Sequence, residues 1–198
     1  MRALIIGGGI GGLTATIALR KKGIDAEVYE RSPILREVGA GISLWPNAVK
    51  ALRKLGLGES LDAISLVNSE AAMRRAHGTV LSRTPAHELE KRFGGGVIVV
   101  PRTELLDLLA QAVGSIPIHL DHSCVELEQD SEGVTARFAN GETARGEILV
   151  GADGLRSVVR THLALPQKLR YSGYTAWRAI VHFDPSGVVA GEGTHRVE

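Results

Sequence analysis

The sequence is poor in cysteine, in aromatic residues and in net charge, and each shortage excludes a class of protein. The single cysteine, Cys124, allows no internal disulfide and no metal site built from several cysteines, which fits a cytoplasmic location where thiols stay reduced. Aromatic residues make up 4% of the chain, too few for a stacking platform that binds single-stranded nucleic acid. A net charge of +1 gives no reason to expect nucleic acid or a membrane surface as a partner.

Long apolar runs are also missing. No stretch approaches the roughly eighteen apolar residues that mark a membrane span. The chain begins with an apolar segment typical of a core strand, so we expect no cleavable signal peptide ahead of the fold. The histidines are scattered apart from His119 and His122. These two lie three residues apart in a strand-like stretch and should point to opposite faces, so we expect no metal site there.

The beginning of the chain carries a glycine pattern with a clear physical use. A strand is expected over residues 2–6 and a helix over 11–22, and glycines stand where one passes into the other. Gly7 permits the tight turn, Gly9 leaves the backbone open to a pyrophosphate, and Gly12 lets the helix lie close to the strand. The helix N-terminus adds free N–H groups and the positive end of the helix dipole, which favour phosphates.

An acidic residue completes this pattern. A second strand is expected over residues 25–30, and it ends in Glu30, about twenty residues beyond the glycines, where a carboxylate can accept hydrogen bonds from ribose hydroxyls. The combination predicts a dinucleotide site of the Rossmann type. Arg31 is open to three interpretations: it stacks on the adenine, it binds a 2′-phosphate, or it is simply solvent-exposed.

The rest of the chain does not continue as a simple doubly wound fold. A glycine-bearing loop at 38–43, a long irregular section and an antiparallel meander come before the chain returns to a buried strand, which leaves room for a dinucleotide bulkier than NAD. The residues 66–76 and 79–83 are expected to form a hairpin around Gly78. The other expected elements are helices over 48–55, 59–64, 102–113 and 155–163, and strands over 97–100, 116–120, 123–129, 133–138, 144–150 and 171–183.

Three further motifs follow in a distinctive order. They are Gly39-Ala-Gly-Ile-Ser-Leu-Trp-Pro-Asn47, Arg102-Thr-Glu-Leu105 of the form RxxL, and Gly151-Ala-Asp-Gly-Leu-Arg-Ser-Val-Val-Arg160 of the form GADGxxSxxR. Together with the GxGxxG pattern, they resemble the class A, single-component FAD-dependent monooxygenases related to p-hydroxybenzoate and salicylate hydroxylases. The nearest resemblance is to the branch that includes 6-hydroxynicotinate and urate hydroxylases.

The resemblance implies an α/β fold in two parts. Residues 1–168 would form a GxGxxG Rossmann-like FAD-binding domain with an inserted antiparallel meander, and residues 169–198 would begin the sheet of a truncated substrate-binding domain. Members of that family continue well beyond this length, so we expect the chain to be an N-terminal portion. A strand without its sheet has unpaired edge groups, so we expect residues 171–198 to be poorly ordered or paired with another chain.

For the adenosine half of FAD, the resemblance implies contacts from the glycines and the acid. The residues concerned are Gly7, Gly9, Gly11 and Gly12 around the pyrophosphate, Glu30 at the ribose, and Arg31 and the backbone near Cys124 at the adenine. Cys124 has a second interpretation as a small buried hydrophobic residue in a strand.

For the flavin half, the resemblance implies four residues from the later motifs. Ser43 would contact the flavin, and Arg102 would hydrogen-bond the ribityl or phosphate region. Asp153 would bind ribityl hydroxyls and help the nicotinamide cofactor dock, while Gly154 would give the backbone a close approach. Asp153 has a second use as a cap of the following helix, and the two uses are compatible.

The chemistry that the resemblance implies belongs to the flavin. NADH or NADPH would reduce FAD, O₂ would add to give a C4a-hydroperoxide, and this species would hydroxylate a small aromatic or heteroaromatic substrate. No universal protein base is implied, so no catalytic residue is assigned. Two other hypotheses remain open, a non-catalytic FAD- or nucleotide-binding fragment and an FAD-dependent reductase. The expected partners are the substrate and O₂, and either a second copy of the chain or a complementing C-terminal segment.

We expect Glu30→Ala and Gly9→Val each to abolish retention of FAD, because one removes the ribose acceptor and the other places a branched side chain against the pyrophosphate. The measurement is the flavin absorbance that stays with each purified variant after unbound FAD is removed, compared with the unmodified chain. Normal FAD affinity in both variants would contradict this assignment of the cofactor site.

Overall fold

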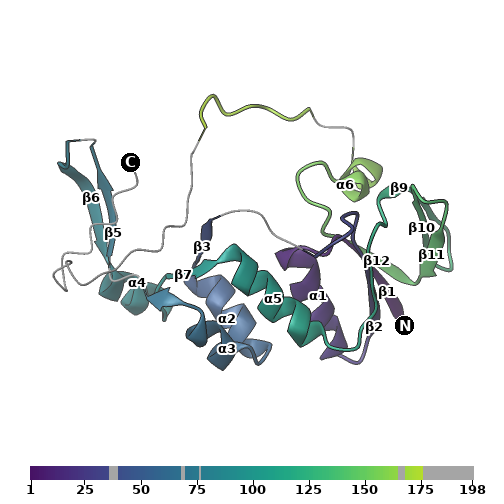
Figure 1. The fold of residues 1–198 in the computed structure, drawn as a ribbon, viewed down its shortest axis with the longest axis horizontal. Helices are drawn as coiled ribbons and strands as arrows, with labels where there is room; N and C mark the ends of the chain where they lie inside the picture. Colours follow the sequence, from purple (N-terminus) through teal and green to yellow (C-terminus); the bar gives the residue numbers. More distant parts are fainter. Residues whose placement is uncertain (36–39, 68–69, 76, 165–167, 176–198) are drawn as a thin grey trace.

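The computed structural model describes residues 1–35, 40–67, 70–75, 77–164 and 168–175. These residues form a mixed α/β fold (Figure 1), as the sequence predicts. Its centre is a four-stranded parallel sheet with the strand order β12-β1-β2-β8. The four strands are β1 (Arg2–Ile6), β2 (Asp25–Tyr29), β8 (Ile118–His119) and β12 (Ile148–Gly151).

Side chains on the central strand β1 alternate between two cores. Ala3 and Ile5 lie on the face covered by helices α1 (Ile10–Arg20) and α5 (Arg102–Val113). Leu4 and Ile6 lie in the second core, on the opposite face, because successive residues of a strand point to opposite sides of a sheet. The expected strands 2–6 and 25–30 and the expected helix 11–22 are therefore confirmed to within two residues.

A three-stranded antiparallel sheet covers the second face. It has the order β11-β10-β9, and helix α6 (Val158–Leu163) packs beside it. Its apolar residues, including Phe138, join Leu4 and Ile6 in one core. The strands are β9 (Cys124–Gln129), β10 (Val134–Phe138) and β11 (Thr143–Gly146).

The prediction of a single strand over 144–150 is wrong, because two strands share that segment. Residues 143–146 pair with β10, whereas residues 148–151 pair with β1 in the parallel sheet. The crossing point is close to the backbone of β1: the N–H of Glu147 donates to the carbonyl of Arg2, and a Cβ on Gly146 would lie 2.8 Å from the same oxygen. The alternating pattern continues through this point, so the sequence does not reveal the change of sheet.

The segment expected as a glycine-bearing loop contains a strand. β3 (Gly41–Leu44) pairs with β7 (Ile98–Pro101), and β7 also pairs with β4 (Leu66–Val67). The backbone groups of β3 find partners on β7 that lie far along the chain, and the local sequence does not show this. Helices α2 (Pro46–Lys54) and α3 (Gly58–Ala63) follow β3, as expected.

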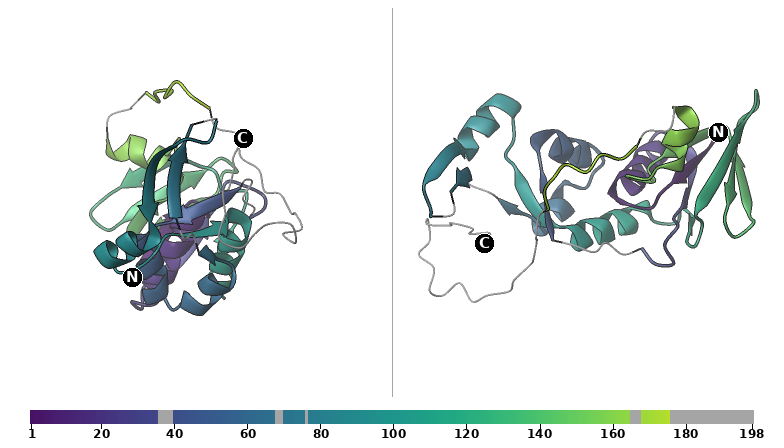
Figure 2. Two further views of the ribbon diagram at one scale, coloured as in Figure 1. Left: turned by 90° about the vertical axis from the view of Figure 1, so that its left-hand side faces the viewer. Right: turned by 90° about the horizontal axis from the view of Figure 1, so that it is seen from above.

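The expected hairpin forms with different bounds: its first strand is shorter than predicted and its second ends two residues later. β5 (Glu70–Arg74) pairs with β6 (Val80–Pro85), and helix α4 (Ala86–Phe93), which the sequence did not predict, follows directly. Figures 1 and 2 show this hairpin at one end of an elongated molecule and the sheet β9–β11 at the other. Residues 168–175 form no helix or strand, and most of the strand expected over 171–183 lies outside the described residues, as do residues 176–198.

Two neighbouring glycines of α1 provide a matched test of the close packing between strand and helix. A Cβ on Gly12 would lie 1.8 Å from the carbonyl oxygen of Gly7, whereas a Cβ on Gly11 would have no atom within 4 Å. We expect Gly12→Ala to lower the free energy of unfolding by at least about 2 kcal/mol through overpacking. Gly11→Ala should raise it by about 0.5 kcal/mol through helix propensity. Equal stabilities in denaturant titrations would contradict this account.

Candidate cofactor-binding site

The carboxyl ends of β1, β2 and β12 open into one cavity of about 470 Å³. Its walls include the turns that follow these strands, residues 7–9, 30–32 and 152–154, together with residues 122–124 at the start of β9. In an open parallel sheet, this edge is where ligands bind. The fold therefore places the first glycine turn opposite the turn of the Gly151–Arg160 motif.

The predicted site residues divide into those that line this cavity and those that do not. Gly12 packs against Gly7, Gly11 is exposed on α1, Ser43 is exposed on β3, and Arg102 begins α5 with its N–H 3.4 Å from the carbonyl of Ala40. The predicted residues that line the cavity are Gly7, Gly9, Glu30, Arg31, Cys124, Asp153 and Gly154.

Glu30 is held by backbone N–H groups on both carboxylate oxygens. Oε2 accepts a hydrogen bond of 2.6 Å from the N–H of Gly8, and Oε1 accepts one of 2.9 Å from the N–H of Ser32. The acid is thus tied directly to the glycine turn. Each oxygen retains a lone pair, so the carboxylate can still accept hydrogen bonds from hydroxyls of a ligand.

Asp153 uses one oxygen to cap α6 and leaves the other without a partner. Oδ2 accepts from the N–H groups of Val158 at 2.7 Å and Val159 at 3.3 Å, so the predicted use as a helix cap is confirmed. Oδ1 is buried and has no hydrogen-bond partner among the described residues. Because Asp153 also lines the cavity, this unpaired acceptor is a candidate partner for a donor on a ligand, such as a ribityl hydroxyl.

The other polar residues of this motif stabilise the helix. Ser157 Oγ accepts a hydrogen bond of 2.9 Å from the N–H of Arg160, and the Arg160 guanidinium donates to the carbonyl of Leu155 at 2.7 Å. Cys124 is buried, and burial raises the pKa of its thiol, which fits the interpretation as a small hydrophobic residue. Cys124 also lies in the cavity lining.

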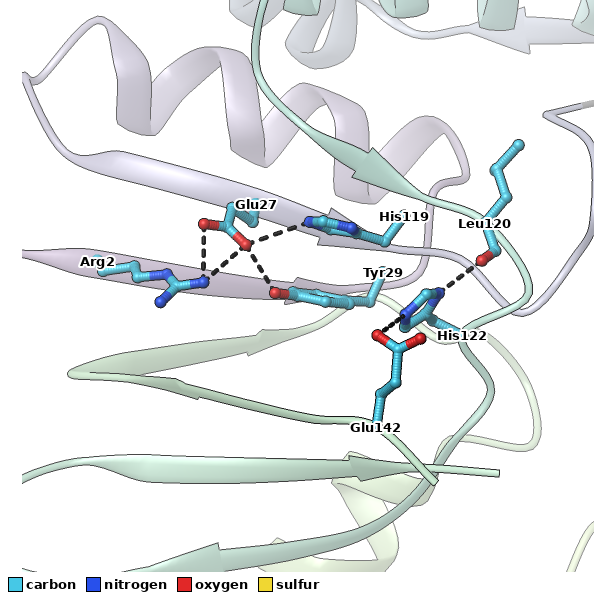
Figure 3. Close-up of polar contacts among 7 residues, drawn as sticks. All are labelled: Arg2, Glu27, Tyr29, His119, Leu120, His122 and Glu142. Carbon is cyan, nitrogen blue, oxygen red and sulfur yellow. Dashed lines mark hydrogen bonds and ion pairs between the residues drawn. The ribbon is translucent and has the colours of Figure 1, made fainter. Parts of the chain in front are cut away.

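A polar and aromatic cluster that the sequence did not predict adjoins the cavity through Tyr29, which is one of its lining residues (Figure 3). The Glu27 carboxylate accepts from Arg2 at 2.8 Å and from the Tyr29 hydroxyl at 2.7 Å, and His119 Nε2 lies 3.2 Å from it. The Tyr29 ring stacks between His119 and Phe138, with 4.7 Å between ring centroids on each side. This stack joins the parallel sheet to the antiparallel one.

The expectation that His119 and His122 point to opposite faces is wrong. Their ring centroids lie 5.5 Å apart, because β8 ends at His119 and Asp121 adopts a left-handed conformation with φ 58°, which breaks the strand alternation. An Asp between the histidines is the one signal that could have indicated this turn. Across the described residues, no three His, Cys, Asp or Glu side chains gather as a metal site requires.

Burial and hydrogen bonding shift two acids of the cluster in opposite directions. Burial, reinforced by the neighbouring Glu27 carboxylate, raises the pKa of Tyr29 to about 12. Burial opposes ionisation of Glu27 as well, but the hydrogen bonds from Arg2 and Tyr29 outweigh it and lower the Glu27 pKa. At the centre of the cluster, the charged Glu27 carboxylate therefore accepts hydrogen bonds from a cationic donor, Arg2, and a neutral one, Tyr29.

The chain matches the FAD binding domain family over residues 1–195 and belongs to that family. Aurachin C monooxygenase/isomerase of Stigmatella aurantiaca is 39% identical over 91% of this chain and 47% of its own length. FAD-dependent urate hydroxylase of Klebsiella pneumoniae is 35% identical over 93% of this chain and 48% of its own length. The chain thus spans about half the length of these relatives.

Two solved structures share the fold. Klebsiella pneumoniae HpxO in complex with FAD and uric acid superposes with a TM-score of 0.73 and 34% identity, over 82% of this chain and 41% of that one. The 2,6-dihydroxypyridine-3-hydroxylase of Arthrobacter nicotinovorans gives a TM-score of 0.68 and 35% identity, over 82% of this chain and 39% of that one. Within the described residues, none of the helices has the length and apolar character needed to cross a bilayer.

The raised pKa of Tyr29 predicts a loss of stability at alkaline pH. An unfolded tyrosine ionises near pH 10, roughly two units below Tyr29 in the folded chain, so this contribution is complete below about pH 10 and is lost between about 10 and 12. Urea titrations over this range should show a fall in unfolding free energy on the order of 1–2 kcal/mol that Tyr29→Phe lacks. The same fall in both proteins would remove Tyr29 as its cause.

Proposed function

We propose that this cavity binds FAD and that the chain is the FAD-binding N-terminal portion of an NAD(P)H-dependent monooxygenase acting on small aromatic or heteroaromatic compounds. The observation that carries the proposal is the cavity itself, which the glycine turn 7–9 lines together with Asp153, whose Oδ1 has no hydrogen-bond partner among the described residues. Residues 1–168 would form the Rossmann-like FAD-binding domain, and residues 169–198 would begin the substrate-binding domain. A cytoplasmic location and association with a second copy or a complementing segment remain predictions.

The adenosine half of FAD would lie along the first glycine turn. Gly9 is the N-cap of α1 and has no side chain that could cap the helix. The first N–H groups of this eleven-residue helix are therefore available to the pyrophosphate. A Cβ on Gly9 would meet nothing within 4 Å, so its lack of a side chain serves a ligand and not the packing of the protein. Glu30 would accept the ribose hydroxyls, with Arg31 and the backbone of Cys124 at the adenine.

The flavin half would extend toward the sheet of β3 and β7. Ser43 pairs with Val99 in this sheet, and Arg102 follows β7 directly, so the two predicted flavin contacts belong to adjoining backbone segments. Asp153 would hold the ribityl chain from the opposite side through Oδ1, with Gly154 beside it. These residues bind and orient the cofactor, and none is assigned as an acid or base.

When bound, FAD supplies the redox chemistry, accepting hydride from NADH or NADPH and activating O₂. Urate, hydroxybenzoate and dihydroxypyridine hydroxylases among the relatives and similar structures support an electron-rich aromatic or heteroaromatic ring as the substrate class. Because the chain spans about half of its relatives, an FAD-binding fragment without turnover is the second candidate. Substrate-stimulated oxidation of NAD(P)H would separate the two.

The test is the visible absorption spectrum of the 198-residue protein after incubation with FAD and removal of unbound cofactor. We expect retained flavin bands, and we expect Asp153→Ala to weaken FAD affinity about tenfold or more, because a charged hydrogen bond to the ligand is lost. Ser157→Ala is the control, because it removes a cap of α6 outside the cavity. Equal losses in both variants would leave Asp153 as a helix cap only, and no retained flavin would contradict the proposal.

A further inference from the structure

His122 connects three segments around the cavity. Its N–H donates a hydrogen bond of 2.9 Å to the carbonyl of Glu30. Its ring Nδ1 lies 2.5 Å from the carbonyl oxygen of Leu120, and Nε2 lies 3.1 Å from Oε2 of Glu142, in the turn between β10 and β11 (Figure 3). The side chain is 11% exposed and lines the cavity. A single residue therefore joins the proposed ribose acid, the cavity wall and the antiparallel sheet.

Both ring nitrogens of His122 face oxygen acceptors. A carbonyl oxygen only accepts hydrogen bonds, and an ionised carboxylate does the same, whereas a neutral imidazole has a single N–H to donate. Glu142 is 68% exposed, and contact with water favours its charged form. Both hydrogen bonds are therefore made together only when the His122 ring carries two protons and a positive charge.

The surroundings of His122 contain charges of both signs. Its ring packs against Tyr29 at 5.6 Å and against the edge of Phe138 at 5.0 Å between centroids. Glu142 makes the direct contact from the antiparallel sheet. Among the described residues, further titratable or charged groups are Asp121 next in the chain, His119 beside the ring, and Glu30, Arg31, Cys124, Asp153 and Arg156 in the cavity lining.

We propose that His122, as an imidazolium between Leu120 and Glu142, is a positioning residue that holds Glu30 and residues 122–124 in the arrangement that binds FAD. The inference rests on the proposed function, since it takes FAD as the occupant of the cavity. Loss of one ring proton breaks one of the two hydrogen bonds. Residues 122–124 then lose their connection either to the carbonyl of Leu120 or to Glu142 of the antiparallel sheet. FAD retention then decreases as the pH rises and the ring loses its second proton.

The test follows the dissociation constant of FAD from pH 6 to 8.5 in the 198-residue chain, by quenching of flavin fluorescence. We expect it to rise about tenfold over this range, which corresponds to the loss of one hydrogen bond. His122→Gln places an amide near Nε2 and His122→Asn places one near Nδ1, so each restores one bond without a titratable proton. Both variants should bind FAD with a weak dependence on pH.

Two further variants keep the test independent of substitutions at His122. Glu142→Gln leaves the histidine in place but removes the charged acceptor, and it should flatten the pH profile. His119→Gln is the matched control, because His119 contacts Glu27 and lies outside the cavity lining, and it should keep the profile of the unmodified chain. A profile unchanged in His122→Gln and Glu142→Gln would overturn the inference.

A measurement without cofactor separates this inference from the proposed function. Nitrogen-15 spectra of the ligand-free chain at pH 6 should show hydrogen-bonded protons on both ring nitrogens of His122, and one proton at pH 8.5. A single ring proton at pH 6 would overturn the proposal whether or not FAD binds. If the unmodified chain binds no FAD at any pH, the proposed function fails, and with it the positioning role for FAD.

Discussion

The contact between the backbones of Gly7 and Gly12 is the constraint on which the rest of the structure depends. Helix α1 follows β1 so closely that a Cβ on Gly12 would lie 1.8 Å from the carbonyl oxygen of Gly7. A Cβ on Gly7 would lie 2.4 Å from the carbonyl oxygen of Ala152. Strand, helix and the turn after β12 approach one another this closely only because no side chain intervenes. This approach brings the carboxyl ends of three parallel strands to one cavity.

Two acids reach that cavity under different restraints, and both restraints come from backbone N–H groups. Glu30 is fixed at both oxygens by the turns after β1 and β2, whereas Asp153 is fixed at one oxygen by the start of α6. Each acid thus has a structural partner and retains capacity to accept further hydrogen bonds. An FAD molecule that lies between them would complete the hydrogen bonding of the buried oxygen of Asp153.

The antiparallel sheet is part of the site through the aromatic cluster around Tyr29, which lines the cavity. Tyr29 stacks between a histidine of the parallel sheet and Phe138 of the antiparallel one, and His122 carries the connection onward to Glu30 and Glu142. Of these residues only Glu30 belongs to the patterns that carry the family resemblance. Their role follows from stacking and hydrogen bonds between residues that are remote in the chain, and no sequence motif marks such contacts.

The sequence by itself determined the glycine turn, the acid at the end of β2 and the capping Asp of α6, because each depends on backbone conformation within a few residues. It also indicated most strands and helices through their apolar periodicity. Only the tertiary structure decided that β3 is a strand, that residues 143–151 divide between two sheets, and that His119 and His122 meet at Tyr29. Those outcomes depend on pairing partners far along the chain and on one left-handed residue, Asp121, which local pattern does not specify.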